Sequence, residues 1–150
     1  MILRISLGAA FLAVFLPSGF GSETRVSMKD LPPAVQKTVQ EQSSGATLRG
    51  LTKEVEHGKT FYEAELKVNG HNRDVLIGSD GAVAEIEEEV PLASLSAPVK
   101  SALEKAAGDG KVVSVESITE GGAVTAYEAK IRRGGKTSEV KVSPDGKIKR

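Results

Sequence analysis

The sequence predicts an α+β protein made of two tandem repeats, each a helix followed by four strands, with both helices packed on one face of an antiparallel sheet. Three observations carry this prediction. The segment 62–66 (YEAEL) reappears at 127–131 (YEAKI), and the Asp-Gly pair that begins at Asp80 returns at Asp145. A helical pattern opens each unit. A two-residue alternation with glycine-containing turns follows each helix, which is typical of strands with one buried face.

Residues 1–21 have the features of a signal peptide. Arg4 supplies positive charge, residues 5–16 are apolar, and small residues follow Pro17. The apolar run is shorter than the roughly 20 residues that a membrane-spanning helix requires. We expect cleavage near Gly21 and a periplasmic or extracellular protein. An uncleaved N-terminal anchor is the alternative.

Composition excludes several classes of function. The chain has 20 basic and 20 acidic residues, so the basic excess expected of a nucleic-acid-binding protein is absent. It has no cysteine, which excludes a lipid-modified cysteine, disulfides, thiol catalysis and cysteine-based zinc sites. After signal cleavage we expect no membrane attachment.

The first helix is predicted by apolar residues four apart, at Leu31, Val35 and Val39, with Asp30 as its N-cap and residues 43–45 (SSG) as its end. The second unit has the same signals: Leu95, Val99 and Leu103 as the apolar stripe, Ser94 or Ser96 as the cap, and residues 108–110 as the end. Both helices are short and amphipathic, so they should lie on a sheet.

Eight strands are predicted, because apolar and charged residues alternate between Asn-Gly, Asp-Gly and Gly-Gly turns. Alternation places Tyr62 and Tyr127 on the buried face. The predicted strands are 47–56, 59–68, 73–77, 82–87, 112–119, 123–132, 136–142 and 147–149.

A carboxylate run followed by proline, at 87–91, divides the repeats into 22–89 and 90–150. Such a run is typical of a solvated connection. A cation site formed by Glu85, Glu87, Glu88 and Glu89 is the alternative, and it would make the protein a structural or cation- or small-ligand-sensing envelope protein.

These motifs resemble the PepSY-like proteins of bacterial envelopes, including those that are similar to the β-lactamase inhibitor protein. The resemblance rests on the helix start at 31–35 (LPPAV), the YEA strands at 62 and 127, and the closing Asp-Gly hairpins. It implies a secreted, non-enzymatic domain that occurs in pairs and binds or restrains peptidases or other envelope proteins. The sequence departs from the aromatic-rich recognition surface of the β-lactamase inhibitor protein.

No catalytic, cofactor-binding or metal-binding set can be assembled. His57 and His71 both neighbour predicted turns, and neither a metal-binding helix spacing nor a cluster of flanking ligands accompanies them. We interpret them as solvated loop residues rather than as a two-histidine metal site. No nucleophile elbow is present, so a hydrolase is not supported.

The candidate partner-binding residues lie on the charged sheet face, where Phe61 must point because its neighbour Tyr62 points inward. They are Phe61, Glu63, Glu65, Lys67, Lys130 and Arg132. Interfaces are usually anchored by a few aromatic and arginine side chains. The alternative is that Phe61 packs under a loop or a strand edge. The expected partner is an envelope or extracellular protein or peptide.

Overall fold

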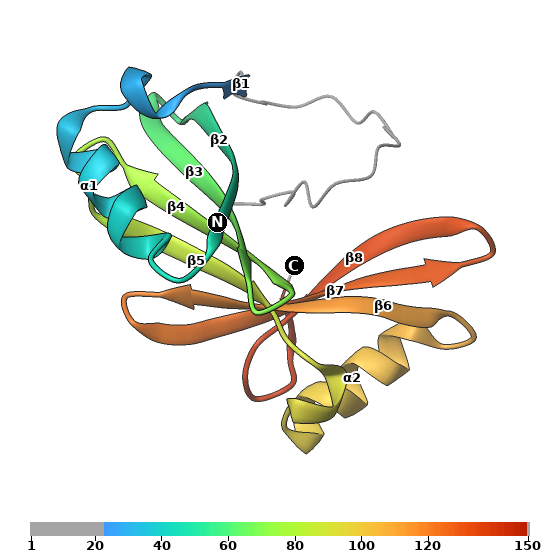
Figure 1. Ribbon diagram of the computed structural model, residues 1–150. Coiled ribbons are helices and arrows are strands. Elements are labelled where there is room, and N and C mark those ends of the chain that lie inside the picture. Colours follow the sequence, from blue (N-terminus) through green and yellow to red (C-terminus); the bar gives the residue numbers. More distant parts are fainter. Residues whose placement is uncertain (1–22, 150) are drawn as a thin grey trace.

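The computed structural model describes residues 23–149, which form an α+β fold with one antiparallel sheet of nine strands (Figure 1). Each strand pairs with its neighbour in sequence, so the spatial order is β1 to β9. The strands are β1 (Thr24–Arg25), β2 (Thr47–Glu56), β3 (Lys59–Val68), β4 (His71–Gly78), β5 (Val83–Glu89), β6 (Lys111–Glu120), β7 (Ala123–Arg133), β8 (Lys136–Val142) and β9 (Ile148–Lys149). The helices are α1 (Pro33–Gln42) and α2 (Ala97–Ala107), each preceded by a 3-10 turn, at Met28–Asp30 and Leu92–Ser94.

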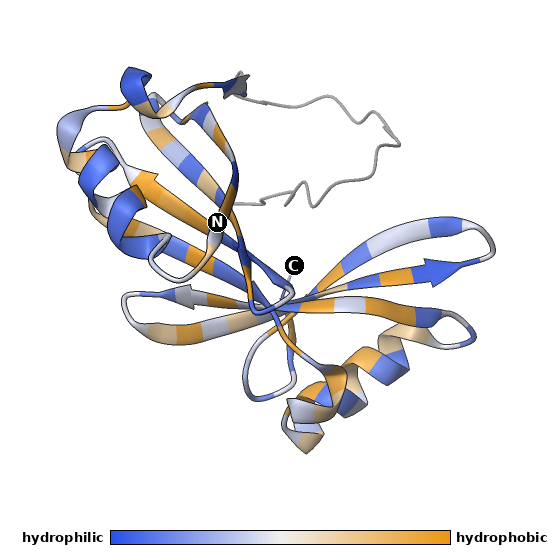
Figure 2. Cartoon of the chain, in the orientation of Figure 1, coloured by the Kyte–Doolittle hydropathy of each residue, from blue (hydrophilic) through white to orange (hydrophobic). Residues whose placement is uncertain are grey.

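The core of the molecule is divided between two clusters, one under each helix. α1 packs over the β2–β5 half and α2 over the β6–β8 half (Figure 1). Around α1 the buried residues are Leu31, Val35, Val39, Leu51, Tyr62, Ala64, Leu66, Val75 and Ile77. Around α2 they are Leu95, Val99, Leu103, Val115, Ala129 and Val142. The alternation of apolar and polar residues along the strands is visible in Figure 2.

Strand register places both helices on the same face of the sheet. Ile86 packs against the first core and shares a face with Glu88, since side chains two apart point the same way. Glu88 pairs with Ser117, and Ser117 shares a face with Val115 of the second core. The two cores therefore lie on one side of a continuous sheet, as the sequence predicts.

The start of α1 differs from the prediction. Asp30 is not its N-cap: Pro32 holds that position and Pro33 begins the helix. The Asp30 carboxylate instead accepts hydrogen bonds from the backbone and hydroxyl of Ser27, capping the 3-10 turn before the helix. Pro32 can precede the helix because the first helical N–H groups have no intrahelical acceptor, so a residue without an N–H loses nothing there.

Two hairpin turns end against the helices, and both require glycine. Gly81 and Gly146 have φ of +85° and +86°. A Cβ at Gly81 would lie 2.8 Å from the Ala34 carbonyl oxygen, and one at Gly146 would lie 2.7 Å from that of Pro98. These Asp-Gly turns therefore lie directly against the first turn of each helix.

The carboxylate run is not a solvated connection. Residues 87–89 belong to β5, which pairs with β4 on one side and with β6 on the other. Glu87 is 7% exposed. The predicted strand ended at Glu87 because the charge of residues 88 and 89 was taken to indicate a connection, whereas these two residues extend β5. Within residues 23–149, no helix is long and apolar enough to cross a membrane.

Candidate functional site

The sheet face opposite the helices, which we call the open face, carries the candidate residues. In the described part of the chain neither helix covers it. Its side chains include Thr52 on β2, Phe61, Glu63, Glu65 and Lys67 on β3, Asp74 and Leu76 on β4, Glu85, Glu87 and Glu89 on β5, Glu116 and Ile118 on β6, Ala126, Glu128 and Lys130 on β7, and Glu139 and Lys141 on β8.

Phe61 lies on the open face, between Glu54 of β2 and Gly78 of β4 in the register. Its neighbour Tyr62 is buried in the first core, at 7% exposure. Phe61 itself is half-buried. Gly78 has no side chain, and the Asp80 carboxylate lies beside the position that its Cβ would take, so an acidic group from the β4–β5 turn lies on that flank of Phe61.

Polar contacts hold the charged residues that follow Phe61 on β3. The Glu65 carboxylate lies 3.5 Å from the Arg25 guanidinium of β1. Lys67 Nζ donates a 2.9 Å hydrogen bond to the Asn72 side chain. Glu63 lies between Thr52 and Leu76 in the register. These side chains form a polar border on one side of Phe61.

Lys130 and Arg132 lie on β7, four strands away from the β3 residues. At about 4.8 Å between neighbouring strands, β3 and β7 are roughly 19 Å apart across the sheet, and the offset along the strands adds to this distance for Phe61 and Arg132. Lys130 pairs with Glu139 in the register, and Arg132 is exposed near the β7–β8 turn. The structure therefore does not bring the six candidate residues together at one point.

Buried carboxylates occupy the space between these two groups. They are Glu85, Glu87, Glu116 and Glu128, each between 5% and 8% exposed. The sequence placed two of them, Glu85 and Glu87, in an alternative cation site and did not select the other two. A carboxylate is rarely this buried in a soluble protein. The sequence does contain a signal for their burial, because each of these glutamates alternates with an aliphatic or small residue on an interior strand.

Glu116 and Glu128 face each other across β6 and β7. Burial raises the pKa of Glu116, and the negative charges of Asp74, Glu139 and Glu89 raise it further, against Lys130. Burial and Glu139 likewise raise the pKa of Glu128, against Lys141, whose ammonium lies 3.5 Å away. Carboxylates from β4 to β8 thus act on one another across the centre of the sheet.

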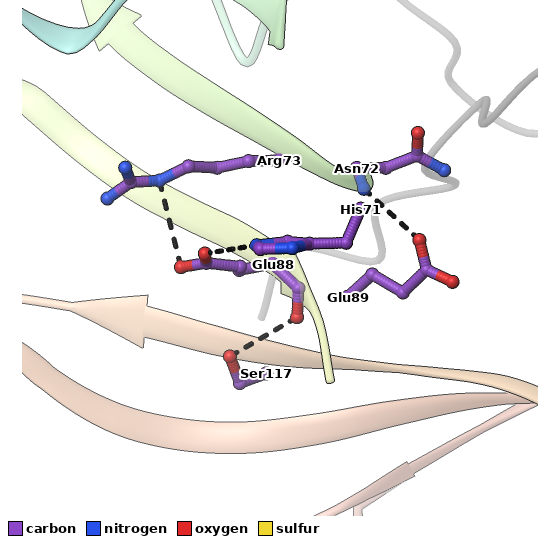
Figure 3. Close-up of polar contacts among 6 residues, drawn as sticks. All are labelled: His71, Asn72, Arg73, Glu88, Glu89 and Ser117. Carbon is purple, nitrogen blue, oxygen red and sulfur yellow. Dashed lines mark hydrogen bonds and ion pairs between the residues drawn. The ribbon is translucent and has the colours of Figure 1, made fainter. Parts of the chain in front are cut away.

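On the helix-side face, a polar cluster joins the two halves at the junction of β4, β5 and β6 (Figure 3). His71 Nε2 lies 2.9 Å from Glu88 Oε1, and Arg73 Nε lies 3.7 Å from Glu88 Oε2. Ser117 Oγ donates a hydrogen bond to the Glu88 carbonyl oxygen. Asn72 N donates to the Glu89 carboxylate. Glu88 is therefore held between two basic side chains.

This cluster corrects the sequence interpretation of His71, which begins β4 and contacts Glu88 rather than lying free in a loop. His57 does occupy the β2–β3 turn, with φ of +49°. Strand alternation also divides the predicted carboxylate cluster, because Glu88 points to the helix side while Glu85, Glu87 and Glu89 point to the open face. Among the described residues, no group of three or more histidine or acidic side chains is arranged to hold a metal ion.

A shallow groove of about 200 Å³ lies where the connection between the halves passes the start of β6. Its lining includes Glu89, Leu92, Val112 and Val113. Val113 is 52% exposed at the β6 bulge. Glu89 thus belongs both to the lining of this groove and to the carboxylates of the open face.

No family model matches the chain, and no curated protein matches its sequence. Several solved structures share its fold. A "putative periplasmic" protein from Bacteroides eggerthii has a TM-score of 0.66 at 18% identity, covering 80% of this chain and 86% of that one. A BLIP-like protein from Bacteroides fragilis has a TM-score of 0.59 at 17% identity, with coverages of 80% and 84%.

A DUF2874 family protein from Bacteroides uniformis has a TM-score of 0.63 at 15% identity, covering 79% of this chain and 86% of that one. At these identities the similarity shows the fold alone. The protein has a BLIP-like fold.

Proposed function

We propose that this protein is an exported, non-enzymatic module that binds a protein or peptide of the envelope on its open face. The observation that carries the proposal is a broad sheet face that neither helix covers, on which a half-buried aromatic side chain, Phe61, borders a field of charged residues. Interfaces generally combine an aromatic anchor with a polar surround of this kind.

Export is part of the proposal. It rests on the predicted signal peptide at residues 1–21, which lies outside the described residues, and on the name of the Bacteroides eggerthii structure. Intact-mass measurement of protein recovered from the envelope tests it. The mature chain should begin near Ser22 or Glu23, and a chain that still carried Arg4 would contradict the expectation.

The finer assignment is a tandem PepSY-like protein that binds or inhibits a peptidase. The BLIP-like fold and the resemblance of the sequence motifs support it. The order of elements, α1 with β2–β5 and then α2 with β6–β9, agrees with an internal duplication. In this proposal the repeats provide the framework, and the open face provides recognition.

Phe61 is the proposed anchor. Its place in the second half, about 65 residues later, is taken by Ala126, so the framework does not require an aromatic residue there. Arg132 is the second candidate. Because β7 lies roughly 19 Å across the sheet from β3 and Arg132 is also offset from Phe61 along the strand direction, it would contact a different part of the same partner.

The decisive experiment compares capture by purified wild type, Phe61→Ala and Ile148→Ala from an envelope extract, with partners identified by mass spectrometry. Ile148 is a matched control, since it is an exposed apolar residue on β9. Phe61→Ala should keep its Tm and lose the captured partner, whereas Ile148→Ala should retain it. If Phe61→Ala unfolds the protein or leaves capture intact, the anchor is wrong.

The absence of enzymatic activity has its own test. Purified protein should hydrolyse peptide, ester and phosphoester substrates no faster than a buffer control. Saturable turnover that is lost on substitution of His57 or His71 would overturn the non-enzymatic assignment.

A further inference from the structure

The centre of the open face is acidic although the whole chain carries no net charge. We call the carboxylates that interact there the acidic patch: Asp74, Glu89, Glu116, Glu128 and Glu139. Two ammonium groups, Lys130 and Lys141, face these five carboxylates. When all seven groups are ionised, five negative charges stand against two positive charges around Glu116 and Glu128.

The two carboxylate oxygens of Glu128 show how little positive charge surrounds these side chains. Its side chain is 6% accessible and its Oε2 lies 3.5 Å from Lys141 Nζ. Its Oε1 is buried and accepts no hydrogen bond from the described residues. A buried carboxylate oxygen without a donor costs free energy that a hydrogen bond from a cation would recover.

The fold does not require these charges. The pair that corresponds to Glu116 and Glu128 in the first half is Thr52 and Glu63, which face each other across β2 and β3. Thr52 is 4% exposed, so a small uncharged side chain fills this place in the sheet without a second carboxylate. Two facing glutamates are therefore a feature of the second half and not a condition for building the sheet.

We propose that the acidic patch receives an arginine or lysine side chain of the partner protein or peptide, with Glu116 and Glu128 as its principal acceptors. The inference rests on the proposed function and names the chemistry of the partner: a cationic segment that lies across the open face. A guanidinium supplies several N–H donors to two facing carboxylates, and an ammonium supplies three. The half-buried Phe61 then contacts another part of the same segment.

Calorimetric titration with capped synthetic peptides tests the chemistry without knowledge of the natural partner. The probe is hexaarginine at neutral pH, and the matched control is hexacitrulline, which has nearly the same shape without the charge. Hexaarginine should bind saturably, and its affinity should fall as salt is raised, because salt screens accessible charges. Hexacitrulline should give no saturable heat.

The same titration with variants of the protein locates the binding site. The double variant Glu116→Gln with Glu128→Gln should weaken hexaarginine binding by about tenfold or more, equivalent to about 1.4 kcal/mol. The control, Glu41→Gln with Glu104→Gln, makes the same charge change on α1 and α2 and should bind like wild type. If the buried double variant does not fold, Glu139→Lys reverses an exposed charge of the patch and should weaken binding in the same direction.

Several results would overturn the inference. Equal binding of hexaarginine and hexacitrulline would do so, as would equal losses in the patch and helix variants. Saturable binding of calcium chloride with no binding of hexaarginine would assign the patch to a metal ion instead. These outcomes differ from a failure of the proposed function. If Phe61→Ala abolishes capture while the patch variants leave capture unchanged, the open face binds a partner, but not through a cationic side chain of that partner.

Discussion

The two halves of this protein use the same order of elements but different interiors. Nine buried residues form the core under α1, including Tyr62, and six form the core under α2. The equivalent Tyr127 is only half-buried and packs at the border of the second core. The core directly under α1 is therefore the larger of the two, although within residues 23–149 each half buries ten apolar residues in all.

The two halves also differ on their open faces, where the second half carries charged residues at positions that are uncharged in the first. The row Thr52, Glu63 and Leu76 in the first half corresponds to Glu116, Glu128 and Lys141 in the second. Charged residues replace a hydroxyl and an aliphatic side chain on the same sheet geometry. The helix-side face therefore sets the fold in both halves. The open face varies between the halves, so it is the surface that can carry a binding site without loss of the fold.

The largest expected difference between the halves concerns the two tyrosines. Tyr62→Ala should lower the free energy of unfolding by about 3 to 5 kcal/mol, because it leaves a cavity in the first core. Tyr127→Ala should cost only about 1 to 3 kcal/mol, since less of the ring is removed from water in the native protein. Urea unfolding measures both. Equal losses would show that the two cores are equivalent despite their different burial.

The turn glycines should give losses of similar size in both halves. Gly81→Ala and Gly146→Ala should each cost about 2 kcal/mol, because a Cβ requires both an unfavourable positive φ and movement of the adjacent helix turn. Gly70→Ala and Gly135→Ala are controls with positive φ and no heavy atom within 4 Å of the added Cβ. These controls should lose less stability, and the difference from Gly81→Ala and Gly146→Ala measures the contribution of the contact with the helix. If all four variants lose the same stability, the helix contacts contribute nothing.

Glu116→Thr makes the second half resemble the first and should stabilise it at neutral pH. The folded-state pKa of Glu116 is raised, so ionised Glu116 disfavours folding above that pKa, and the penalty disappears as pH falls toward its ordinary value of 4.5. We expect Tm to rise by roughly 1 to 3 °C at neutral pH. The gain should shrink on acidification.

The reciprocal variant, Thr52→Glu, should lower Tm at neutral pH, since it places a carboxylate at a buried position beside half-buried Glu63. Thermal unfolding followed at several pH values checks both substitutions. A Glu116→Thr variant that is less stable than wild type at neutral pH would mean that the Glu116 charge is already compensated within the protein.

The smallest effect is expected at the last hairpin. Hydrogen bonds from Lys147 and Ser143 lower the pKa of Asp145 from 3.8 to about 2. Its contribution to stability is therefore present above the ordinary value and is lost as pH falls toward 2. The corresponding Asp80 hairpin has Ala82 in place of Lys147. In Lys147→Ala, carbon-detected NMR titration should show the Asp145 midpoint moving upward, and an unchanged midpoint would contradict the role of Lys147.

Local signals in the sequence predicted most of the fold. Alternation and turn glycines gave the bounds of β2, β3 and β8 as the structure has them, because both ends of each strand are marked by residues that favour turns. Asp30 was misassigned because its cap belongs to a 3-10 turn that no periodicity reveals. The two-residue β1 was also missed, since its pairing with β2 depends on tertiary contacts.

The candidate site was harder to predict. The direction of Phe61 followed from strand alternation alone. Burial of Glu116 and Glu128 did not, because it arises from neighbouring strands on both sides, which a single strand pattern cannot show. The predicted β5 strand ended at Glu87, two residues early, for the same reason. Pairing of β5 with β6, which joins the halves, turned a charged segment into an interior strand.

A sheet whose spatial order follows the chain from β1 to β9 also has consequences for how the protein folds. Each new strand pairs with the one just before it, so most ladders close a short turn, and only β1–β2 and β5–β6 span a helix. Such topologies fold quickly for β-rich proteins. A chain that emerges from a translocation pore N-terminus first could add one strand at a time to an edge already in place. The carboxylates of β5 would keep that growing edge soluble until β6 arrives to cover it.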